Sequence, residues 1–270
     1  MAIPRKAVVC GVRVLGRSAR AIELELSDAE PLGWRGGQYI IVDGGFTLPS
    51  GKACKRAYSP VNDDREPARL ELWVLRIEQG PGSGFLHAVE PGREIAFSGP
   101  WGKLHPSSGS TTSTSTAASA PPPAAERTLI LATDTGITAA LGLVRSARMA
   151  PLLARTAFIW LRADPDYFVP EAEVRARLPP GIGHVELGLA PPIGDPARLA
   201  HARAVLAERG GAAAFTQGFI SGDGLVNYGL LDDLVAAGIP ATRENVESFF
   251  NLPKRPAPAA APGPAPAVAG

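Results

Sequence analysis

The pattern of hydrophobic and polar positions divides the chain into two halves of different kind. Up to residue 105, short apolar runs alternate with turn signals such as Gly44-Gly45 and Pro91-Gly92. These runs predict strands over residues 7–14, 21–26, 39–42, 70–77 and 94–98, and a short helix over residues 85–89. Short strands with little helix are typical of a closed antiparallel barrel, which is the fold we predict for this half.

The second half alternates between compact apolar runs and longer amphipathic ones. The compact runs predict strands over residues 128–132, 157–161, 184–189, 215–221 and 245–249. The longer runs predict helices over residues 137–148, 170–178, 195–209 and 227–237. Asp195 is the expected N-cap of the third helix, with Pro196 at its first position. Strands without polar positions, alternating with helices, predict a Rossmann-like parallel sheet covered on both faces.

Two segments of low complexity set the domain boundaries. Residues 106–126 are mostly Ser, Thr, Ala and Pro, and residues 253–270 are mostly Pro and Ala. Such sequences bury too little apolar surface to offset the entropy of ordering, so we expect a disordered linker and a disordered tail. The predicted organisation is therefore a barrel domain over 1–105 and an α/β domain over 127–252.

Composition and charge narrow the functional classes. A chain of 270 residues with a formal net charge of +1 fits two ordinary domains and offers no global field for nucleic acid. Cys10 and Cys54 are too few for an iron–sulfur cluster, and the four histidines lack the spacing of a zinc site, so no metal is expected. No apolar stretch approaches the ~20 residues that cross a bilayer, so a cytoplasmic location without a membrane contact is expected.

The string Arg56-Ala57-Tyr58-Ser59, which follows a Gly-Gln-Tyr strand at residues 37–39, is the most informative short motif. It resembles the flavin-binding signature of the ferredoxin–NADP⁺ reductase-like superfamily. The residue types suit that role: Arg offers a fork of donors to a pyrophosphate, Tyr a flat face for the flavin ring, and Ser a hydroxyl for the redox-active nitrogen. The alternative is an ordinary strand edge.

Two further elements follow in the order that this superfamily shows. Gly82, Ser83 and Gly84 lie in a glycine-rich turn that opens a short helix, and resemble the second flavin motif. The resemblance implies that they bind the FAD pyrophosphate from the side opposite Arg56, on backbone N–H groups. Residues 91–104 resemble the end of the flavin barrel, with a Pro-Gly turn, a strand and Gly-Pro-aromatic-Gly. The resemblance thus covers residues 6–104.

The start of the second half resembles the nicotinamide nucleotide loop of the same superfamily. Thr135, Gly136 and Ile137 match its Gly-Thr-Gly-Ile string, whereas Asp134 replaces the first Gly and Ala139 the usual Pro. The loop is expected to hold a pyrophosphate at a helix N-terminus. A carboxylate at position 134 would repel that group and obstruct the turn; alternatively, Asp134 caps the helix that follows.

Four more positions are identified through this resemblance. Ser221 and Gly222 match the second nucleotide motif, in which Ser221 replaces a Cys near the nicotinamide and Asp223 replaces a Pro. Glu247 and Phe249 match the closing segment, where the acid supports proton delivery and the aromatic ring covers the flavin. Phe249 and Phe250 also suit an ordinary core. Ser59, Ser221 and Glu247 are thus the candidate catalytic residues.

Arg162 resembles the superfamily's arginine at the end of the second strand of the nucleotide sheet. The Ser-Arg pair of enzymes specific for NADPH is missing after residues 184–189, which favours NADH over NADPH.

The resemblance implies an FAD-dependent NAD(P)H oxidoreductase that passes electrons to a ferredoxin or another one-electron acceptor. A second hypothesis is a flavoprotein electron-transfer subunit or binding module with a degenerate nicotinamide site, because Asp134, Ser221 and Asp223 depart from the pattern. A third is a flavin reductase that uses flavin only as a substrate; Arg56 and the turn at 82–84 argue against it, since they imply bound FAD.

Overall fold

The computed structural model describes residues 4–28, 30–106 and 127–250. The predicted linker, apart from Pro106, and the predicted tail lie outside these residues. In the described ranges, no helix has the length and apolar character needed to cross a membrane. The cytoplasmic location stays a prediction.

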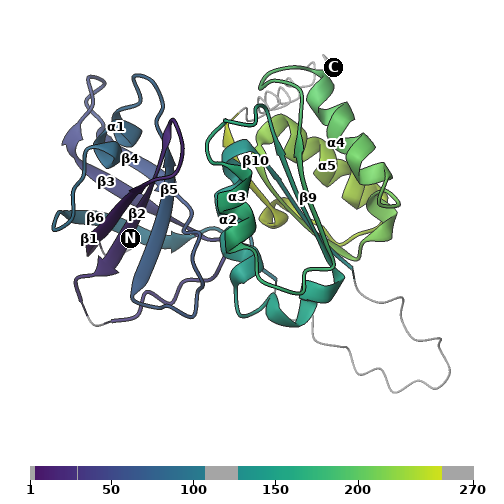
Figure 1. Ribbon diagram of the computed structural model, residues 1–270, viewed down its shortest axis with the longest axis horizontal. Helices are drawn as coiled ribbons and strands as arrows, with labels where there is room; N and C mark the ends of the chain where they lie inside the picture. Colours follow the sequence, from purple (N-terminus) through teal and green to yellow (C-terminus); the bar gives the residue numbers. More distant parts are fainter. Residues whose placement is uncertain (1–3, 29, 107–126, 251–270) are drawn as a thin grey trace, which may run out of the picture.

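The first half is a six-stranded antiparallel sheet in the order β4-β3-β6-β1-β2-β5, curled into a barrel (Figure 1). Its strands are β1 (Arg5–Val14), β2 (Ala19–Leu26), β3 (Tyr39–Thr47), β4 (Ala53–Tyr58), β5 (Arg69–Leu75) and β6 (Glu94–Trp101). Beyond β4, Pro60 forms a bridge with Leu72, and the Val61 N–H donates to the Glu71 carbonyl at 2.9 Å. These bonds bring the two ends of the sheet together, and α1 (Pro81–His87) packs beside β4 and β5.

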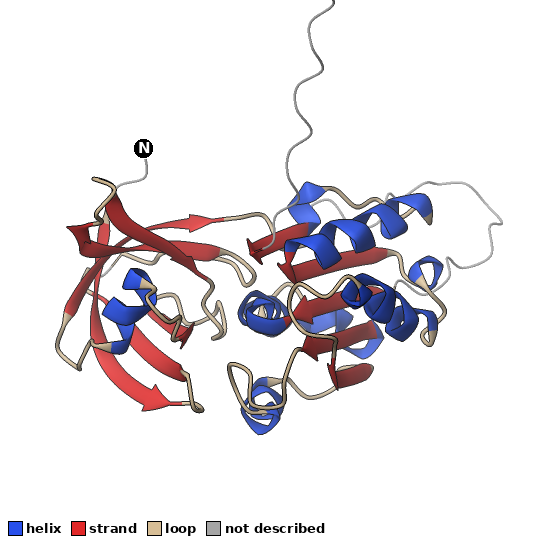
Figure 2. Cartoon of the chain, turned by 90° about the horizontal axis from the view of Figure 1, so that it is seen from above, coloured by secondary structure: helices blue, strands red, loops and turns tan. Residues whose placement is uncertain are grey.

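The second half is a parallel sheet in the order β11-β10-β7-β8-β9. Its strands are β7 (Thr128–Thr133), β8 (Thr156–Arg162), β9 (His184–Leu189), β10 (Gln217–Asp223) and β11 (Val246–Phe250). The helices are α2 (Ile137–Arg145), α3 (Glu171–Arg177), α4 (Ala197–Ala207) and α5 (Gly224–Ala236), with 3₁₀ turns at Asp134–Gly136, Ala150–Arg155, Ala212–Ala214 and Arg243–Asn245. Helices cover both faces of the sheet (Figure 2). The predicted two-domain architecture is confirmed.

The strand order reverses between β7 and β10, so the loops that follow these two strands open side by side. In open α/β sheets, ligands bind at such a switch point, beyond the carboxyl ends of the strands. The fold therefore directs attention to residues 134–136 and 221–223.

All five helices differ from the sequence prediction at one or both ends, and the contacts at two of these ends are informative. Helix α2 ends at Arg145 rather than 148, because Ser146 is extended and the Ala147 N–H donates to Asp64 of the barrel at 2.9 Å. Helix α4 begins at Ala197 rather than 195. Its N-cap is Pro196 rather than the expected Asp195, although the Asp195 carboxylate accepts a hydrogen bond from the Ala197 N–H at 2.8 Å just before the helix.

The two halves share a hydrophobic core. Leu15, Val61 and Leu104 of the barrel belong to the same buried cluster as Leu141 of α2. The approach is closest at Gly36, where an added Cβ would lie 1.9 Å from the Gly142 carbonyl oxygen. Both partners at this contact are backbone atoms. The barrel and α2 can therefore approach this closely only because residue 36 has no side chain.

An ion pair crosses the same interface. The Glu71 carboxylate of β5 accepts hydrogen bonds from both terminal nitrogens of Arg177 in α3 and from the indole N–H of Trp73 at 2.9 Å. Glu71 sits at a polar position of an alternating strand, where exposure is expected, yet it is 6% exposed because α3 covers it. A carboxylate at this depth depends on its partner.

We expect Arg177→Met to lower the free energy of unfolding by about 2 kcal/mol, measured by urea denaturation. This is less than the ~3–5 kcal/mol of fully buried pairs, because the Arg177 side chain keeps 24% exposure. Arg13→Met is the matched control, since Arg13 pairs with Glu173 of the same helix across the same interface but is 43% exposed. A control loss as large as that of Arg177→Met would contradict a special role for the Glu71 pair.

Candidate functional site

A cavity of about 740 Å³ opens between the barrel and the parallel sheet. That volume suits a small-molecule or cofactor site. Its lining comes from both halves: Tyr39, Arg56, Ala57, Tyr58, Ser59, Trp73, Leu75, Arg76 and Ile77 from the barrel, and Thr135, Thr138, Tyr167, Phe168, Ile193, Glu247, Ser248, Phe249 and Phe250 from the second half.

All four residues of the predicted flavin signature line this cavity. Arg56, Ala57 and Tyr58 end β4, and Ser59 follows directly. Burial raises the pKa of the Tyr58 phenol to about 12, so the ring stays neutral at physiological pH. Ser59 is 3% exposed, and its hydroxyl has no hydrogen-bond partner among the described residues. A buried hydroxyl left without a partner is costly, and because Ser59 lines the cavity its hydroxyl is available to a ligand atom there.

The glycine-rich turn lies against Arg56. A Cβ at Gly82 would lie 2.5 Å from the Arg56 Cγ, and a Cβ at Gly84 would lie 2.4 Å from the Arg76 Nη1. Both guanidinium side chains thus run across the two glycines at the start of α1. The Ser83 hydroxyl is engaged locally, since it accepts from the Ile77 N–H at 3.1 Å and donates to the Gly80 carbonyl at 3.1 Å.

These observations fit an FAD. The unpartnered Ser59 hydroxyl suits a polar edge of the flavin ring, and Tyr58 offers a neutral aromatic wall. Arg56 and Arg76 offer two cations to a pyrophosphate, and Gly82 and Gly84 let these two side chains pack against the start of α1. Arg56, Tyr58, Ser59, Gly82 and Gly84 would hold the cofactor. The role of Ser83 would be to fix the turn.

The nucleotide loop reaches the same cavity from the other side. Thr135 and Thr138 line it, and the Thr138 hydroxyl donates to the Thr135 carbonyl at 3.1 Å. Gly136 is packed too closely for any side chain, because a Cβ there would lie 2.4 Å from the Ser221 carbonyl. The Ser221 hydroxyl donates to the Gly136 carbonyl at 2.9 Å, and Ser221 is 1% exposed. In this arrangement Ser221 joins the two loops beneath the cavity wall.

Asp134 does not cap the helix that follows, so that interpretation is wrong. Helix α2 begins after Gly136 with no side-chain cap bond. The Asp134 carboxylate turns away and is fully buried; it accepts from the Ala163 N–H at 3.0 Å and from Arg198 at 2.5 Å. Its backbone adopts φ +50°, a conformation that glycine adopts more easily. The loop thus keeps the left-handed turn without a glycine, and the expected obstruction is absent among these residues.

The closing segment lies at the bottom of the same cavity. Glu247, Ser248, Phe249 and Phe250 of β11 all line it. Strict alternation predicts Phe250 on the opposite face from Phe249, but the β10–β11 register shifts between Gly222 and Asp223, which turns the strand end. Burial raises the pKa of Glu247 to about 7, and burial together with the nearby Glu247 raises the pKa of Tyr39.

Two predicted residues lie behind the cavity wall. Arg162 is 6% exposed; it donates to Glu171 at 3.2 Å and covers the Trp160 ring at 4.7 Å from the ring centre. Gly222 has φ +117° and lies so close to Thr133 that a Cβ would be 2.2 Å from its carbonyl oxygen. Arg162 and Gly222 therefore support the loops at the carboxyl ends of β8 and β10.

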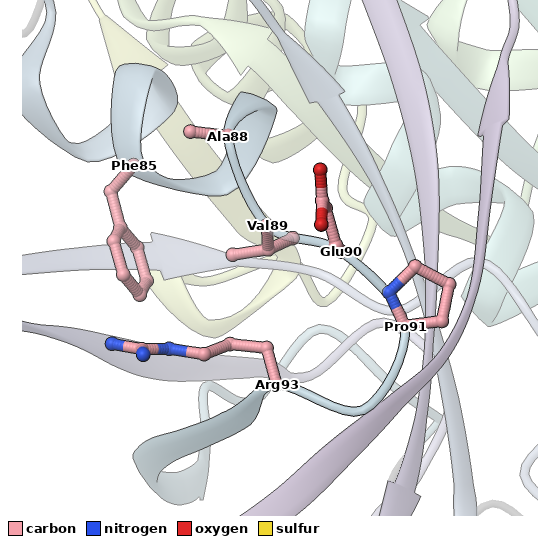
Figure 3. Close-up of a pocket in the computed structure, with 6 residues that line it drawn as sticks. All are labelled: Phe85, Ala88, Val89, Glu90, Pro91 and Arg93. Atoms are coloured by element: carbon pink, nitrogen blue, oxygen red, sulfur yellow. The ribbon is translucent and has the colours of Figure 1, made fainter.

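A second hollow of about 390 Å³ lies at the far end of α1 (Figure 3). Its lining is Phe85, Ala88, Val89, Glu90, Pro91 and Arg93. Glu90 and Arg93 carry opposite charges there, so the hollow offers no net positive charge to a phosphate. The candidate site is the larger cavity, which joins the two halves.

Sequence reasoning missed several residues of the cavity wall, among them Arg76, Trp73 and Tyr167. Arg76 carried a usable signal, because it is a cation directly after a buried strand and four residues before the Gly80 turn. Trp73 and Tyr167 carried none, since aromatic residues in strands and loops are usually core.

Comparison with known families and curated proteins covers mainly the first half of the chain. Residues 6–105 match the family described as "Oxidoreductase FAD-binding domain". Ferredoxin–NADP reductase B of Sorangium cellulosum is 31% identical over 158 residues, which is 58% of this chain and 57% of that protein. NADH-cytochrome b5 reductase 2 of Aspergillus terreus is 30% identical over 90 residues, 33% of this chain and 28% of that protein. The chain thus spans little more than half of the first relative.

Solved structures with the same fold cover nearly the whole chain. The cytochrome P450 reductase GcoB of Amycolatopsis aligns with a TM-score of 0.66 at 19% identity, over 94% of this chain and 72% of that one. Phthalate dioxygenase reductase aligns with a TM-score of 0.56 at 19% identity, over 90% of this chain and 67% of that one. At these identities the likeness concerns the fold.

Proposed function

Because residues 6–105 match an oxidoreductase FAD-binding domain and the chain shares the fold of ferredoxin reductase-like proteins, we propose that it is a member of that superfamily and an FAD-dependent NAD(P)H oxidoreductase. The observation that carries the proposal is a single cavity lined by Ser59 of the flavin signature, Thr135 of the nucleotide loop and Glu247 of the closing strand. When bound, the flavin accepts a hydride and releases electrons singly.

The roles of this chain's residues follow from their positions. Arg56, Gly82 and Gly84 bind the cofactor's pyrophosphate, with Arg76 as a second cation. Tyr58 and Ser59 orient the ring. Thr135 and Gly136 place the nucleotide. Phe249 covers the ring, and Glu247 holds a proton within the cavity.

For the acceptor, we propose a ferredoxin or another one-electron protein. Support comes from the relatives, whose names specify reduction involving ferredoxin, cytochrome b5 and cytochrome P450. In the chain itself, the described residues hold no group of His, Cys, Asp and Glu arranged to bind a metal.

The second candidate function, a flavoprotein subunit with a degenerate nicotinamide site, is favoured by Asp134 and Asp223 at positions where the pattern has Gly and Pro. The buried pairing of Asp134 with Arg198 weighs against it, because a compensated carboxylate repels a pyrophosphate much less than a free one. We therefore propose that the nucleotide half binds NAD(P)H.

The test is anaerobic addition of NADH, and separately NADPH, to purified protein that retains flavin through gel filtration. Loss of the visible flavin band within seconds supports the oxidoreductase. If flavin is retained but neither nucleotide reduces it, the flavoprotein electron-transfer subunit is the remaining function. If the protein binds no flavin, both functions are wrong. We expect NADH to be the faster donor, because Arg162 is already paired with Glu171 and a 2′-phosphate needs uncommitted cations.

The pH dependence of flavin reduction should report Glu247. Its pKa is about 7, above the usual carboxyl value, so the side chain is protonated at lower pH and ionised at higher pH. Ionisation adds negative charge to the cavity that receives the hydride. We expect reduction by NADH to slow about threefold to tenfold between pH 6 and pH 8. Glu247→Gln should remove this dependence, and a Gln variant that keeps it would assign the titration elsewhere.

A further inference from the structure

Three ionisable side chains lie buried together behind the nucleotide loop. Asp134 follows β7, Asp223 ends β10, and Arg198 comes from α4; their exposures are 0%, 1% and 3%. The Arg198 Nη2 lies 2.5 Å from the Asp134 carboxylate, and its Nε lies 3.8 Å from the Asp223 carboxylate. One guanidinium therefore connects the two loops that open at the switch point of the sheet.

Both acids are also held by backbone and ring donors. The Asp134 carbonyl accepts from the Trp160 indole N–H at 2.9 Å, and its carboxylate accepts from the Ala163 N–H. The Asp223 carboxylate accepts from the Leu225 N–H at 3.0 Å, and the Asp223 N–H donates to the Thr133 hydroxyl at 2.7 Å. Each loop is therefore fixed by its acid, and the acids are fixed by Arg198.

The charges at this point need the guanidinium. Two carboxylates in a dry interior repel each other and any neighbouring anion, and such groups are retained only when paired. Burial raises the pKa of Asp134, and Arg198 partly opposes that rise. Tyr167, which lines the cavity, feels the same charges, because its pKa is raised to about 12 by burial and by Asp134. The network therefore reaches the cavity electrostatically.

We propose that Arg198 is a positioning residue for the nicotinamide nucleotide: it compensates Asp134 and Asp223 and locks the two loops that carry Thr135 and Gly222. This rests on the proposed function, because it concerns the nucleotide that reduces the flavin. It explains how the chain replaces a glycine and a proline by two acids yet keeps Gly136 against Ser221.

The proposal predicts that removal of Arg198 lowers the affinity for NAD⁺ only while Asp134 and Asp223 are present. In the flavin-loaded protein, Arg198→Met should weaken NAD⁺ binding about tenfold or more, measured by isothermal titration calorimetry, because it leaves buried carboxylates facing a pyrophosphate. The neutral set Arg198→Met with Asp134→Asn and Asp223→Asn should recover most of the affinity, since Asn tolerates the left-handed turn at position 134. Arg203→Met is the matched control on the same helix, as Arg203 pairs with Asp233 at the surface.

Two results would overturn the proposal: wild-type affinity in Arg198→Met, or a neutral triple variant as weak as the single one. If Arg198→Met fails to fold, Arg198→Lys carries the test, because it keeps the charge but not the two-point geometry and should bind at an intermediate level. Calorimetry with NAD⁺ measures binding without reduction. If the wild type binds NAD⁺ but its flavin is not reduced by NADH, the proposed function is wrong, whereas the proposal for Arg198 can still be tested by binding.

Discussion

Gly222→Ala should slow flavin reduction by NADH more than about a hundredfold and lower the free energy of unfolding by about 3 kcal/mol or more. Gly222 has φ +117°, where a side chain is strained, and a Cβ would lie 2.2 Å from the Thr133 carbonyl oxygen and 2.4 Å from its hydroxyl. Relief requires β7 and β10 to separate at the switch point. That movement displaces Asp223 and Ser221, and with them the nucleotide loop.

Gly238→Ala separates strain from crowding. Gly238 also has a left-handed backbone, with φ +78°, but nothing lies within 4 Å of an added Cβ. The free energy of unfolding of this control should fall by only about 1 kcal/mol, which is the conformational cost of a side chain at positive φ. NADH should reduce its flavin at the normal rate. Stopped-flow absorbance and thermal unfolding measure the two effects. Normal reduction in Gly222→Ala would mean that the loops at 134–136 and 221–223 are not the nucleotide site.

The kind of sheet in each half was predictable because each half repeats one local pattern, whereas the order of the strands was not. Buried runs such as residues 129–132 have no polar position, whereas barrel strands such as β2 alternate, so the periods separate a parallel sheet from an antiparallel one. The end of α2 was not predictable in this way. It is set by the bond from Ala147 to Asp64, a contact between residues 83 positions apart.

The site residues show the same difference between local patterns, which the sequence predicts, and contacts between distant residues, which it does not. The contiguous strings at 56–59 and 80–84 were identified from sequence; in the structure residues 56–59 line the cavity, and Gly82 lies against Arg56 outside that lining. The partners that decide charge were not, because Arg198 lies 64 residues from Asp134 and Arg177 lies 106 residues from Glu71. From sequence, Asp134 reads as a free carboxylate beside a phosphate. In the fold it is a buried carboxylate that is paired with Arg198.

The second large effect concerns Ser59. Ser59→Ala should slow flavin reduction by NADH about tenfold to hundredfold, because it removes a hydroxyl of the cavity lining that we propose to meet the flavin ring. Thermal stability of the flavin-free protein should hold or rise slightly. The hydroxyl is buried without a partner among the described residues, so its removal ends a desolvation cost rather than a bond.

Ser146→Ala provides the matched control. Ser146 is also 3% exposed, and its hydroxyl likewise lacks a partner within the described part of the chain, but it lies at the end of α2 outside the cavity lining. Both variants should therefore resemble each other in stability, and only Ser59→Ala should slow reduction and alter the visible flavin spectrum. Equal reduction rates would assign the unpartnered Ser59 hydroxyl to packing alone and remove the hydrogen bond to the flavin from the proposed mechanism.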